Sequence, residues 1–295
     1  MSNIIPAGVD FEDVTVDPDN KKYYSQNNCI LTKADNVIIN GGAYSTIPET
    51  AVAIGDSAFN GSAIKSVVIP SNIKSLGDNA FKSCNNLEEI VIENGLEEIK
   101  KGVFSRCKNI KSITIPESVT KIEDGSFISL CSSLEELKVA TANTVYYSKD
   151  DYILTKTDNT IVAGTLKKAI PEEATAIGMR AFYGNGYISE VRIPANIKAI
   201  KEEAFRGCGN LKTVFLEGGG VIGDFAFDKC GLLTNVYFSN GVTKVTEKGC
   251  MTESCNVRSV TLPDNIDLDG EYALRTHVPQ TIYYPEDLEF LGVGG

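Results

Sequence analysis

The stretch IPSNIKSLGDNAFKSCNNLEEI, Ile69 to Ile90, decides the fold, because close copies of it recur along the chain. The segment IPANIKAIKEEAFRGCGNLKTV, Ile193 to Val214, has the same Ile-Pro start, Ala-Phe pair, Cys and Leu at matching positions. Self-similarity with a period of this size is typical of a solenoid, in which each repeat is one rung of a stack. A phenylalanine marks the period, with steps of 22 or 23 residues inside two runs: Phe59, Phe81, Phe104 and Phe127, then Phe182, Phe205 and Phe227.

A second repeat, at an offset of 123 residues, divides the chain into two similar halves. The segment YYSQNNCILTKADNVIING, Tyr23 to Gly41, matches YYSKDDYILTKTDNTIVAG, Tyr146 to Gly164, at 11 of 19 positions. We therefore predict a tandem duplication with four parts: a lead-in at 1–19, a hairpin plus four rungs at 20–142, a second such module at 143–263, and a closing segment at 264–295.

Each rung contains the pattern of a short parallel strand. In Leu87, Ile90 and Ile92 the last two apolar residues alternate, as in an extended chain with one buried face. Proline follows such strands directly, as at Pro116, and ends them because it cannot donate a hydrogen bond to a sheet. A second short extended piece, Ser118 to Asp124, and a compact turn such as Asp78 to Cys84 complete the rung.

The Tyr146 to Gly164 segment interrupts the rungs. It lengthens the step from Phe127 to Phe182 to 55 residues and consists of two alternating runs separated by residues 156–159. Asp158 and Asn159 tolerate left-handed turn geometry, so this segment predicts a β-hairpin. The expected fold is a β-rich solenoid with short parallel strands, interrupted by β-hairpin modules.

The cysteines follow the repeat. Five of them lie three residues before an apolar core position: Cys84, Cys107, Cys131, Cys208 and Cys230. Cysteine in phase with core residues indicates a small buried hydrophobic side chain, so we expect stacked free thiols. Disulfides between neighbouring rungs remain the alternative.

The composition excludes several classes of protein. A net charge of −11 without any basic run argues against nucleic acid as a partner. No apolar stretch is long enough to span a bilayer. The first residues lack the pattern of a signal peptide, which fits either an intracellular protein or one from which the peptide has been removed.

No catalytic, metal or cofactor site is expected. A nucleophilic serine or cysteine needs a base, and the one histidine, His277, lies outside the repeats, where it is best interpreted as a surface residue. Glu202 and Glu203 belong to recurring pairs that we interpret as a solvated face. Gly218 to Gly223 aligns with a turn between strands, and no helix is indicated after it, so a phosphate-binding loop is not expected.

The residues between the inward positions of each strand point outward and form rows across the rungs. One row reads Val68, Val91, Thr114, Lys138, Arg192, Phe215, Tyr237 and Thr261. Arginine and aromatic residues dominate binding energy at protein interfaces. The candidate ligand-binding patch is Arg192, Phe215, Tyr237, Glu190, Thr213 and Asn235. The alternative is that the two aromatic rings only pack on each other or under a loop.

Rungs of the form Ile-Pro-x-x-Val-x-x-Ile-x-x-x-Ala-Phe-x-x-Cys-x-x-Leu-x-x-Ile resemble the BspA-like leucine-rich repeats, and the resemblance covers most of the chain. Two departures are Glu93-Asn94 in place of the usual proline, and Cys250 in place of the last Phe. The resemblance implies that the solenoid is of the leucine-rich-repeat class, a right-handed superhelix of α/β type. It also implies a cell-surface or secreted protein used in adhesion and host-protein binding.

We therefore expect a non-enzymatic binding protein whose partner is a host or extracellular-matrix protein. A carbohydrate- or mucin-binding surface protein and an intracellular repeat scaffold are the alternatives. A solenoid fold provides a surface and does not dictate its ligand.

Overall fold

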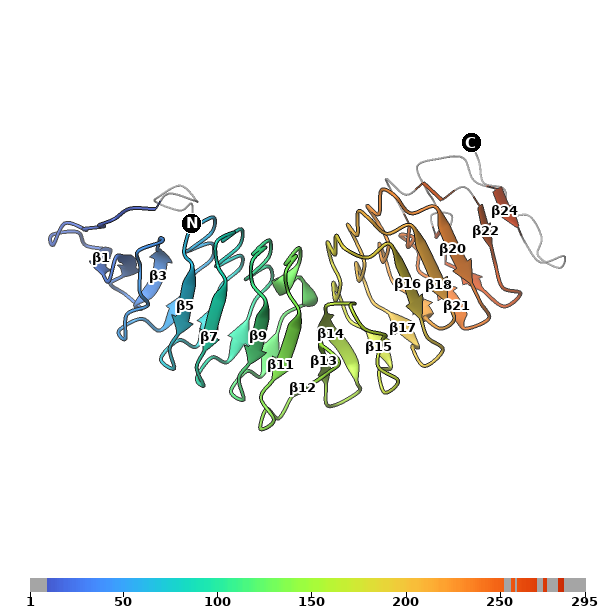
Figure 1. Cartoon of the computed structure of the whole chain (residues 1–295), viewed down its shortest axis with the longest axis horizontal. Helices are drawn as coiled ribbons and strands as arrows, with labels where there is room; N and C mark the ends of the chain where they lie inside the picture. Colours follow the sequence, from blue (N-terminus) through green and yellow to red (C-terminus); the bar gives the residue numbers. More distant parts are fainter. Residues whose placement is uncertain (1–9, 252–255, 258, 270–272, 275–280, 284–295) are drawn as a thin grey trace. The chain divides into compact units, whose positions relative to one another are not determined.

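The computed structural model describes residues 10–251, 256–257, 259–269, 273–274 and 281–283. The chain divides into two compact units, Met1–Lys156 and Thr157–Gly295. Each unit is a stack of rungs joined by turns, with strands of successive rungs side by side (Figure 1). The four-part division drawn from the sequence stays a prediction.

The longer strand of each rung provides the first side of the stack. In β5, for example, Val67 and Ile69 are buried while Ser66 and Val68 are exposed, as the alternation predicted. These strands pair in parallel as β5 with β7, β9 with β11, and β16 through β18, β20 and β22 to β24. They are β5 (Ser66–Ile69), β7 (Glu89–Ile92), β9 (Ser112–Ile115), β11 (Glu136–Val139), β16 (Glu190–Ile193), β18 (Thr213–Leu216), β20 (Asn235–Phe238), β22 (Ser259–Thr261) and β24 (Thr281–Tyr283).

The second side of the stack is a parallel ladder of shorter strands. Most of these strands contribute at least one buried aliphatic residue, such as Ile54, Leu76 and Ile99. In the first unit the ladder runs through β3 (Val37–Asn40), β4 (Ala53–Ile54), β6 (Ser75–Leu76), β8 (Glu98–Ile99) and β10 (Lys121–Ile122). In the second it runs through β14 (Thr160–Gly164), β15 (Ala176–Ile177), β17 (Ala199–Ile200), β19 (Gly220–Ile222), β21 (Val242–Val245) and β23 (Asp267–Leu268).

The third side consists of turns that are hydrogen-bonded from rung to rung. The Phe59 amide donates to Ala80 O and the Phe81 amide to Val103 O, both at 2.8 Å. The phenylalanine rings of these turns also stack from rung to rung, with centroids 4.9 Å apart for Phe59 and Phe81 and 5.7 Å apart for Phe81 and Phe104. Among the described residues the one helix is the 3-10 turn η1 (Gly125–Ile128), so turns occupy the side where other repeats of this class can carry a helix.

The repeat cysteines link each turn to the rung before it. The Sγ atoms of Cys84, Cys107 and Cys131 lie 3.0, 2.9 and 3.0 Å from the carbonyl oxygen of the phenylalanine one rung back, and Cys208 and Cys230 make the same contact at 3.3 Å. All seven described cysteines are buried and free, which confirms the expected thiols. Burial raises the pKa of the Cys29 thiol to about 11, so it stays protonated at neutral pH. Cys255 lies outside the described residues.

The segment that interrupts the rungs, Tyr146 to Gly164, and its copy Tyr23 to Gly41 each contain one turn more than the sequence predicted. In the first unit β1 (Tyr23–Gln26) and β2 (Cys29–Thr32) are antiparallel, and β2 is in turn antiparallel to β3. In the second copy the run taken as one strand is likewise split into β12 (Tyr146–Lys149) and β13 (Tyr152–Thr155). The two-residue loops Asn27-Asn28 and Asp150-Asp151 have φ between 50° and 63°, the left-handed geometry that tight hairpins require.

Both departures from the repeat pattern affect the stack. Where Glu93-Asn94 replaces proline, β7 and β9 belong to separate sheets, and Ile90 and Ile92 are only half-buried. In most other rungs the Phe amide donates to the residue just before the next phenylalanine, as Phe59 does to Ala80. The Phe227 amide donates to Cys250 O, so Cys250 occupies the alanine position of the Ala-Phe pair. Met251, which is fully buried, takes the place of the phenylalanine, and the assignment of Cys250 to that place was wrong.

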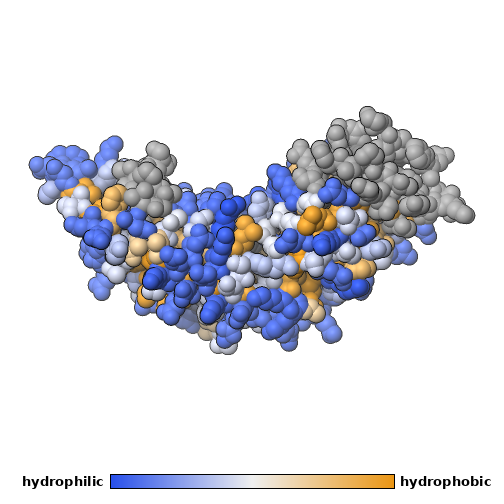
Figure 2. Space-filling model, turned by 45° about the horizontal axis from the view of Figure 1, so that its top comes forward, coloured by the Kyte–Doolittle hydropathy of each residue, from blue (hydrophilic) through white to orange (hydrophobic). Residues whose placement is uncertain are grey.

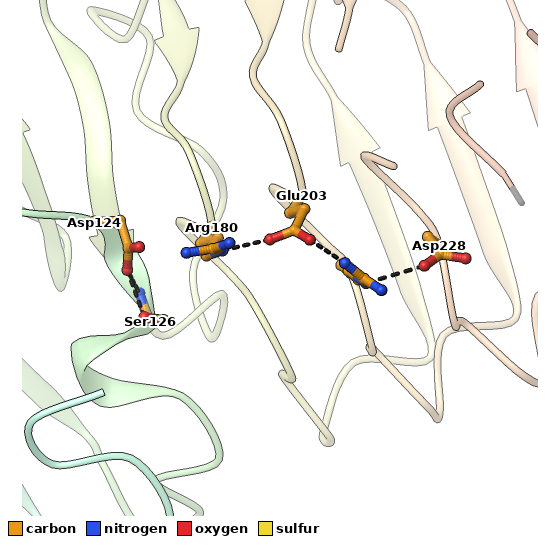
Figure 3. Close-up of polar contacts among 6 residues, drawn as sticks. Asp124, Ser126, Arg180, Glu203 and Asp228 are labelled. Atoms are coloured by element: carbon orange, nitrogen blue, oxygen red, sulfur yellow. Dashed lines mark hydrogen bonds and ion pairs between the residues drawn. The ribbon is translucent and has the colours of Figure 1, made fainter. Parts of the chain in front are cut away.

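A chain of ion pairs crosses three rungs on the turn side of the second unit. The Glu203 carboxylate accepts hydrogen bonds from the Arg180 and Arg206 guanidinium groups, and Arg206 Nε lies 2.9 Å from Asp228 Oδ2. Figure 3 shows Arg180 and Asp228 on either side of Glu203. The same figure shows Asp124 accepting a 2.8 Å hydrogen bond from the Ser126 amide, which caps η1.

Glu203 is only 5% exposed, so its assignment to a solvated face was wrong, although its neighbour Glu202 is exposed. Burial raises the pKa of the Glu203 carboxyl group, but hydrogen bonds from Arg180 and Arg206 lower it by more, and the pKa lies below its ordinary value. Buried ion pairs contribute little net stability, yet they penalise any arrangement that separates the charges. We therefore expect these ion pairs to favour a single register of the three rungs.

Replacing Phe104 with alanine should lower the free energy of unfolding by about 3 to 5 kcal/mol, because the cavity cannot be refilled between stacked rings. Urea denaturation followed by circular dichroism measures the change. Phe11→Ala is the matched control, since Phe11 is 41% exposed and its loss should cost less than about 1 kcal/mol. Equal losses for the two variants would contradict a phenylalanine core.

Replacing Glu203 with glutamine should destabilise the protein by about 1 to 3 kcal/mol at pH 7, because two guanidinium groups lose their partner. A carboxyl group whose pKa is lower in the folded than in the unfolded protein stabilises the fold at pH values above its unfolded pKa. That contribution is lost as the pH falls through the folded pKa. The difference between wild type and variant should therefore shrink as the pH falls below about 4. Denaturation curves at several pH values test this, with Glu202→Gln as the control that changes little at any pH.

Candidate functional site

The outward face of the longer strands in the second unit holds the candidate site. Strands β16, β18 and β20 are paired in register, so that Arg192 lies beside Phe215 and Phe215 beside Tyr237. The neighbouring positions on each strand, Val191, Val214 and Val236, are buried. The core residues thus fix the strand alignment, and that alignment places the outward side chains in a row.

The three side chains of this row form a continuous stack. Arg192 Cζ lies 3.8 Å from the centroid of the Phe215 ring. The Phe215 and Tyr237 centroids are 4.9 Å apart, with the ring planes only 9° from parallel. Since β18 lies between β16 and β20, one face of Phe215 is covered by the guanidinium group and the other by Tyr237. We call Arg192, Phe215 and Tyr237 the sheet stack.

Two carboxylates hold the arginine over the ring. Arg192 Nε is 3.2 Å from Glu190 Oε1, and Arg192 Nη1 is 3.8 Å from Glu217 Oε1. All three charged side chains are more than half exposed, so these pairs add little stability. Their consequence is geometric, because they limit the positions that the guanidinium group can take above Phe215.

The second row of the patch is polar and in the same register. Glu190, Thr213 and Asn235 are aligned across the three strands. Asn235 is exposed and its Nδ2 donates to Thr234 Oγ1 at 3.1 Å. The structure therefore brings all six residues of the predicted patch together on one face.

The sheet stack remains accessible in the described structure. Tyr237 is 53% exposed and Phe215 is half-buried against its two neighbours. The two rings pack on each other, as the alternative interpretation expected, and Tyr237 is nevertheless exposed; the role of the patch in binding stays a prediction. Figure 2 shows hydrophobic surface in separate patches set among hydrophilic residues.

The corresponding row in the first unit has different chemistry. Val68 and Val91 are paired in register and about half exposed, and Thr114 is paired with Lys138. Lys138 Nζ forms a 2.7 Å ion pair with Glu136 on its own strand. Among the described residues of these two rows, the stack of arginine and aromatic rings is therefore found in the second unit and not in the first.

The other sequence candidates are placed as follows. Gly218 needs glycine for packing, because a Cβ there would lie 2.2 Å from Pro194 O of the previous rung, and no helix follows it. In the described part of the chain no group of three or more His, Cys, Asp or Glu side chains is arranged to hold a metal ion. His277 lies outside the described residues.

No helix among the described residues is both long and apolar enough to cross a membrane. A search of curated proteins finds no match to the chain.

Two solved structures share the fold. The structure of the pneumococcal vaccine antigen PcpA is similar with a TM-score of 0.61 and 16% identity, over 81% of this chain and 67% of that one. A leucine-rich repeat protein from Eubacterium ventriosum is similar with a TM-score of 0.53 and 18% identity, over 93% of this chain and 97% of that one. At these identities the likeness shows the fold alone, a β-solenoid of stacked parallel strands.

The family model described as BspA type leucine rich repeat region matches six copies, over residues 43–150 and 165–291. These two blocks lie on the repeating turns and strands described above and cover well over half of the chain. Proteins of this repeat class typically bind other proteins and are generally non-enzymatic. The chain therefore belongs to the BspA-type leucine-rich repeat family.

Proposed function

We propose that this chain is a non-enzymatic binding protein that recognises a protein partner through the sheet stack of its second unit. The observation that carries the proposal is the ordered arrangement of Arg192, Phe215 and Tyr237 on an exposed sheet. Arginine and large aromatic side chains supply most of the binding energy at protein interfaces. Side chains that are already ordered lose less entropy on binding, which favours affinity.

Protein recognition fits the stack better than carbohydrate recognition. A sugar ring binds by lying flat against an open aromatic face. Both faces of Phe215 are occupied, at 3.8 Å by Arg192 and at 4.9 Å by Tyr237, which leaves at most one open aromatic face in the stack, that of Tyr237. The exposed ring edges, the Tyr237 hydroxyl and the carboxylates beside Arg192 suit a partner that offers apolar side chains with hydrogen-bond donors.

We further propose that the protein acts at the cell surface or after secretion, in adhesion to host or extracellular-matrix proteins. The BspA-type family supports this role, and one protein with the same fold is a pneumococcal vaccine antigen. The acidic net charge of −11 favours a partner with basic residues near its contact surface.

Binding to a panel of immobilised host-surface and extracellular-matrix proteins tests the proposal. The double variant Phe215→Ala/Tyr237→Ala should lose at least about tenfold in affinity for a partner that wild type captures, because two hot-spot side chains are removed. Arg192→Lys should weaken the same binding, since lysine keeps the charge but lacks the planar group that stacks on Phe215.

The matched control is Val68→Ala/Val91→Ala, which trims the equivalent exposed row of the first unit and should leave binding unchanged. Thermal unfolding verifies that all variants are folded. Unchanged binding by the folded double variant contradicts the role of the sheet stack. Binding of wild type to a glycan array that is lost with Tyr237→Ala would instead favour a carbohydrate ligand.

A further inference from the structure

The row of longer strands in the first unit is interrupted between β7 and β9 (Figure 1). β5 pairs with β7 and β9 pairs with β11, but β7 and β9 belong to separate sheets. The other two sides of the same junction are bonded, because β8 pairs with β10 and the Phe104 amide donates to Phe127 O at 2.7 Å. We call the interruption between β7 and β9 the seam.

A missing backbone donor explains the seam. After β9 comes Pro116, which has no N–H group to offer to Ile92 O at the end of β7. The first strands of the other two sheets of longer strands, β5 and β16, are also followed by proline, Pro70 and Pro194. After the later strands β7, β11, β18 and β20 the next residue donates to the end of the preceding strand at 2.9 to 3.1 Å: Glu93 to Ile69 O, Ala140 to Ile115 O, Gly218 to Ile193 O and Ser239 to Leu216 O.

The apolar core is partly open along the seam. The inward residues of β7, Ile90 and Ile92, are half-buried, whereas those of β5, Val67 and Ile69, are 6% and 0% exposed. The inward residues of β9 are buried as well, so the opening lies along β7. Val91, which is 53% exposed, borders it on the outside.

A smaller break in the second unit follows the same rule. The pairing of β20 with β22 stops at Thr261, two residues before Pro263. Phe238, which follows the paired residues of β20, is half-buried. Among the longer strands whose burial the structure describes, the inward residues that are not buried are thus Ile90, Ile92 and Phe238. All three lie opposite a strand that leads into a proline.

The seam also contains backbone groups that no strand pairs with. In a parallel sheet, successive residues direct their N–H and C=O groups alternately to the two neighbouring strands. The Glu89 and Glu93 amides donate toward the β5 side. The groups of Ile90 and Ile92 therefore point toward β9, with which β7 forms no ladder. A free edge of this kind is a template for another extended chain.

The ends of the seam are mainly acidic. Within two residues of β7 and β9, four glutamates are exposed against a single exposed lysine, Lys111. The glutamates are Glu88, Glu89, Glu93 and Glu117. This border favours a partner segment that has basic residues at its ends.

We propose that the seam binds an extended segment of a partner protein as an added β-strand. The backbone of the segment would pair with β7 at Ile90 and Ile92, and one row of its aliphatic side chains would cover these two isoleucines. Its basic ends would lie near the glutamates. Room for the added strand comes from further separation of β7 and β9, which no strand pairing opposes. This site is distinct from the sheet stack of the second unit.

Binding of a labelled synthetic peptide to the full chain, followed by fluorescence anisotropy, tests the proposal. The peptide alternates valine with threonine and has a lysine at each end. We expect saturable binding, and hydrogen–deuterium exchange at β7 and β9 should slow when the peptide is added. A second peptide has the same side chains but N-methylated inner amides, so it cannot pair as a strand. It should bind at least about tenfold more weakly.

Pro116→Ala is the decisive variant, because it restores an N–H group that can donate to Ile92 O. The variant should join β9 to β7 and weaken peptide binding by about tenfold or more. Pro194→Ala is the matched control. It makes the same change after β16, the first strand of its sheet, and should leave binding within about twofold of wild type. Thermal unfolding verifies that both variants are folded.

Wild type that binds no peptide up to about 1 mM overturns the proposal. Equal binding of the two peptides would indicate contact with apolar side chains alone and contradicts strand addition, as does unchanged binding by folded Pro116→Ala. Dimers of wild type that Pro116→Ala abolishes, measured by sedimentation velocity, would assign the seam to a second copy instead.

The test is independent of the proposed function. The Phe215→Ala/Tyr237→Ala variant should bind the peptide as wild type does, and protection from exchange confined to β16, β18 and β20 would contradict binding in the seam. Failure here therefore leaves the proposed function standing, and failure of partner binding at the sheet stack leaves this proposal standing.

Discussion

Every part of this structure depends on the fact that a single rung cannot bury its own apolar residues. Each rung contributes one phenylalanine or its equivalent, a few aliphatic residues from two short strands and, in most rungs, a cysteine. Only the next rung covers them. The Phe59 and Phe81 rings at 4.9 Å and the contact from Cys84 Sγ to Phe59 O at 3.0 Å show how closely the layers meet. Stability is therefore distributed between neighbours, as expected for a solenoid.

This constraint separates the positions that maintain the fold from those that are free to vary. The inward residues keep the same character in both units because they face the same layer on the next rung. The outward row differs: Val68 and Val91 in the first unit correspond in position to Arg192 and Phe215 in the second. The two halves thus share the same core pattern and present different outward surfaces. Binding specificity can therefore reside in the outward row without a cost to folding.

The sequence predicts the features that recur in every rung, such as the strands and their inward residues. It does not predict features that depend on contacts between rungs or on departures from the repeat. Alternation in each strand predicted that Arg192, Phe215 and Tyr237 would align, because the side-chain period of a strand is two. The burial of Glu203 was not predictable, since it depends on Arg180 and Arg206 from two different turns, and Glu203 follows an ordinary exposed Glu202. The loop at Asn27-Asn28 was missed because Tyr23 to Thr32 was taken as one extended run, although two adjacent asparagines tolerate the left-handed geometry of a tight turn. Met251 was missed because the last turn shifts by one residue relative to the repeat.

Hydrogen–deuterium exchange tests the central claim that the turn side is as much a part of the stack as the strands. In the sequence, Gly77 to Cys84 resembles a surface loop, whereas in the structure the Phe81 amide is bonded to Val103 O and the Ser83 amide to Ser105 O. The account predicts that peptides covering these turns exchange as slowly as those covering β7 and β9, with protection falling toward the ends of each unit. Turns that exchange as fast as the exposed Asn27-Asn28 loop, beside protected strands, would contradict it.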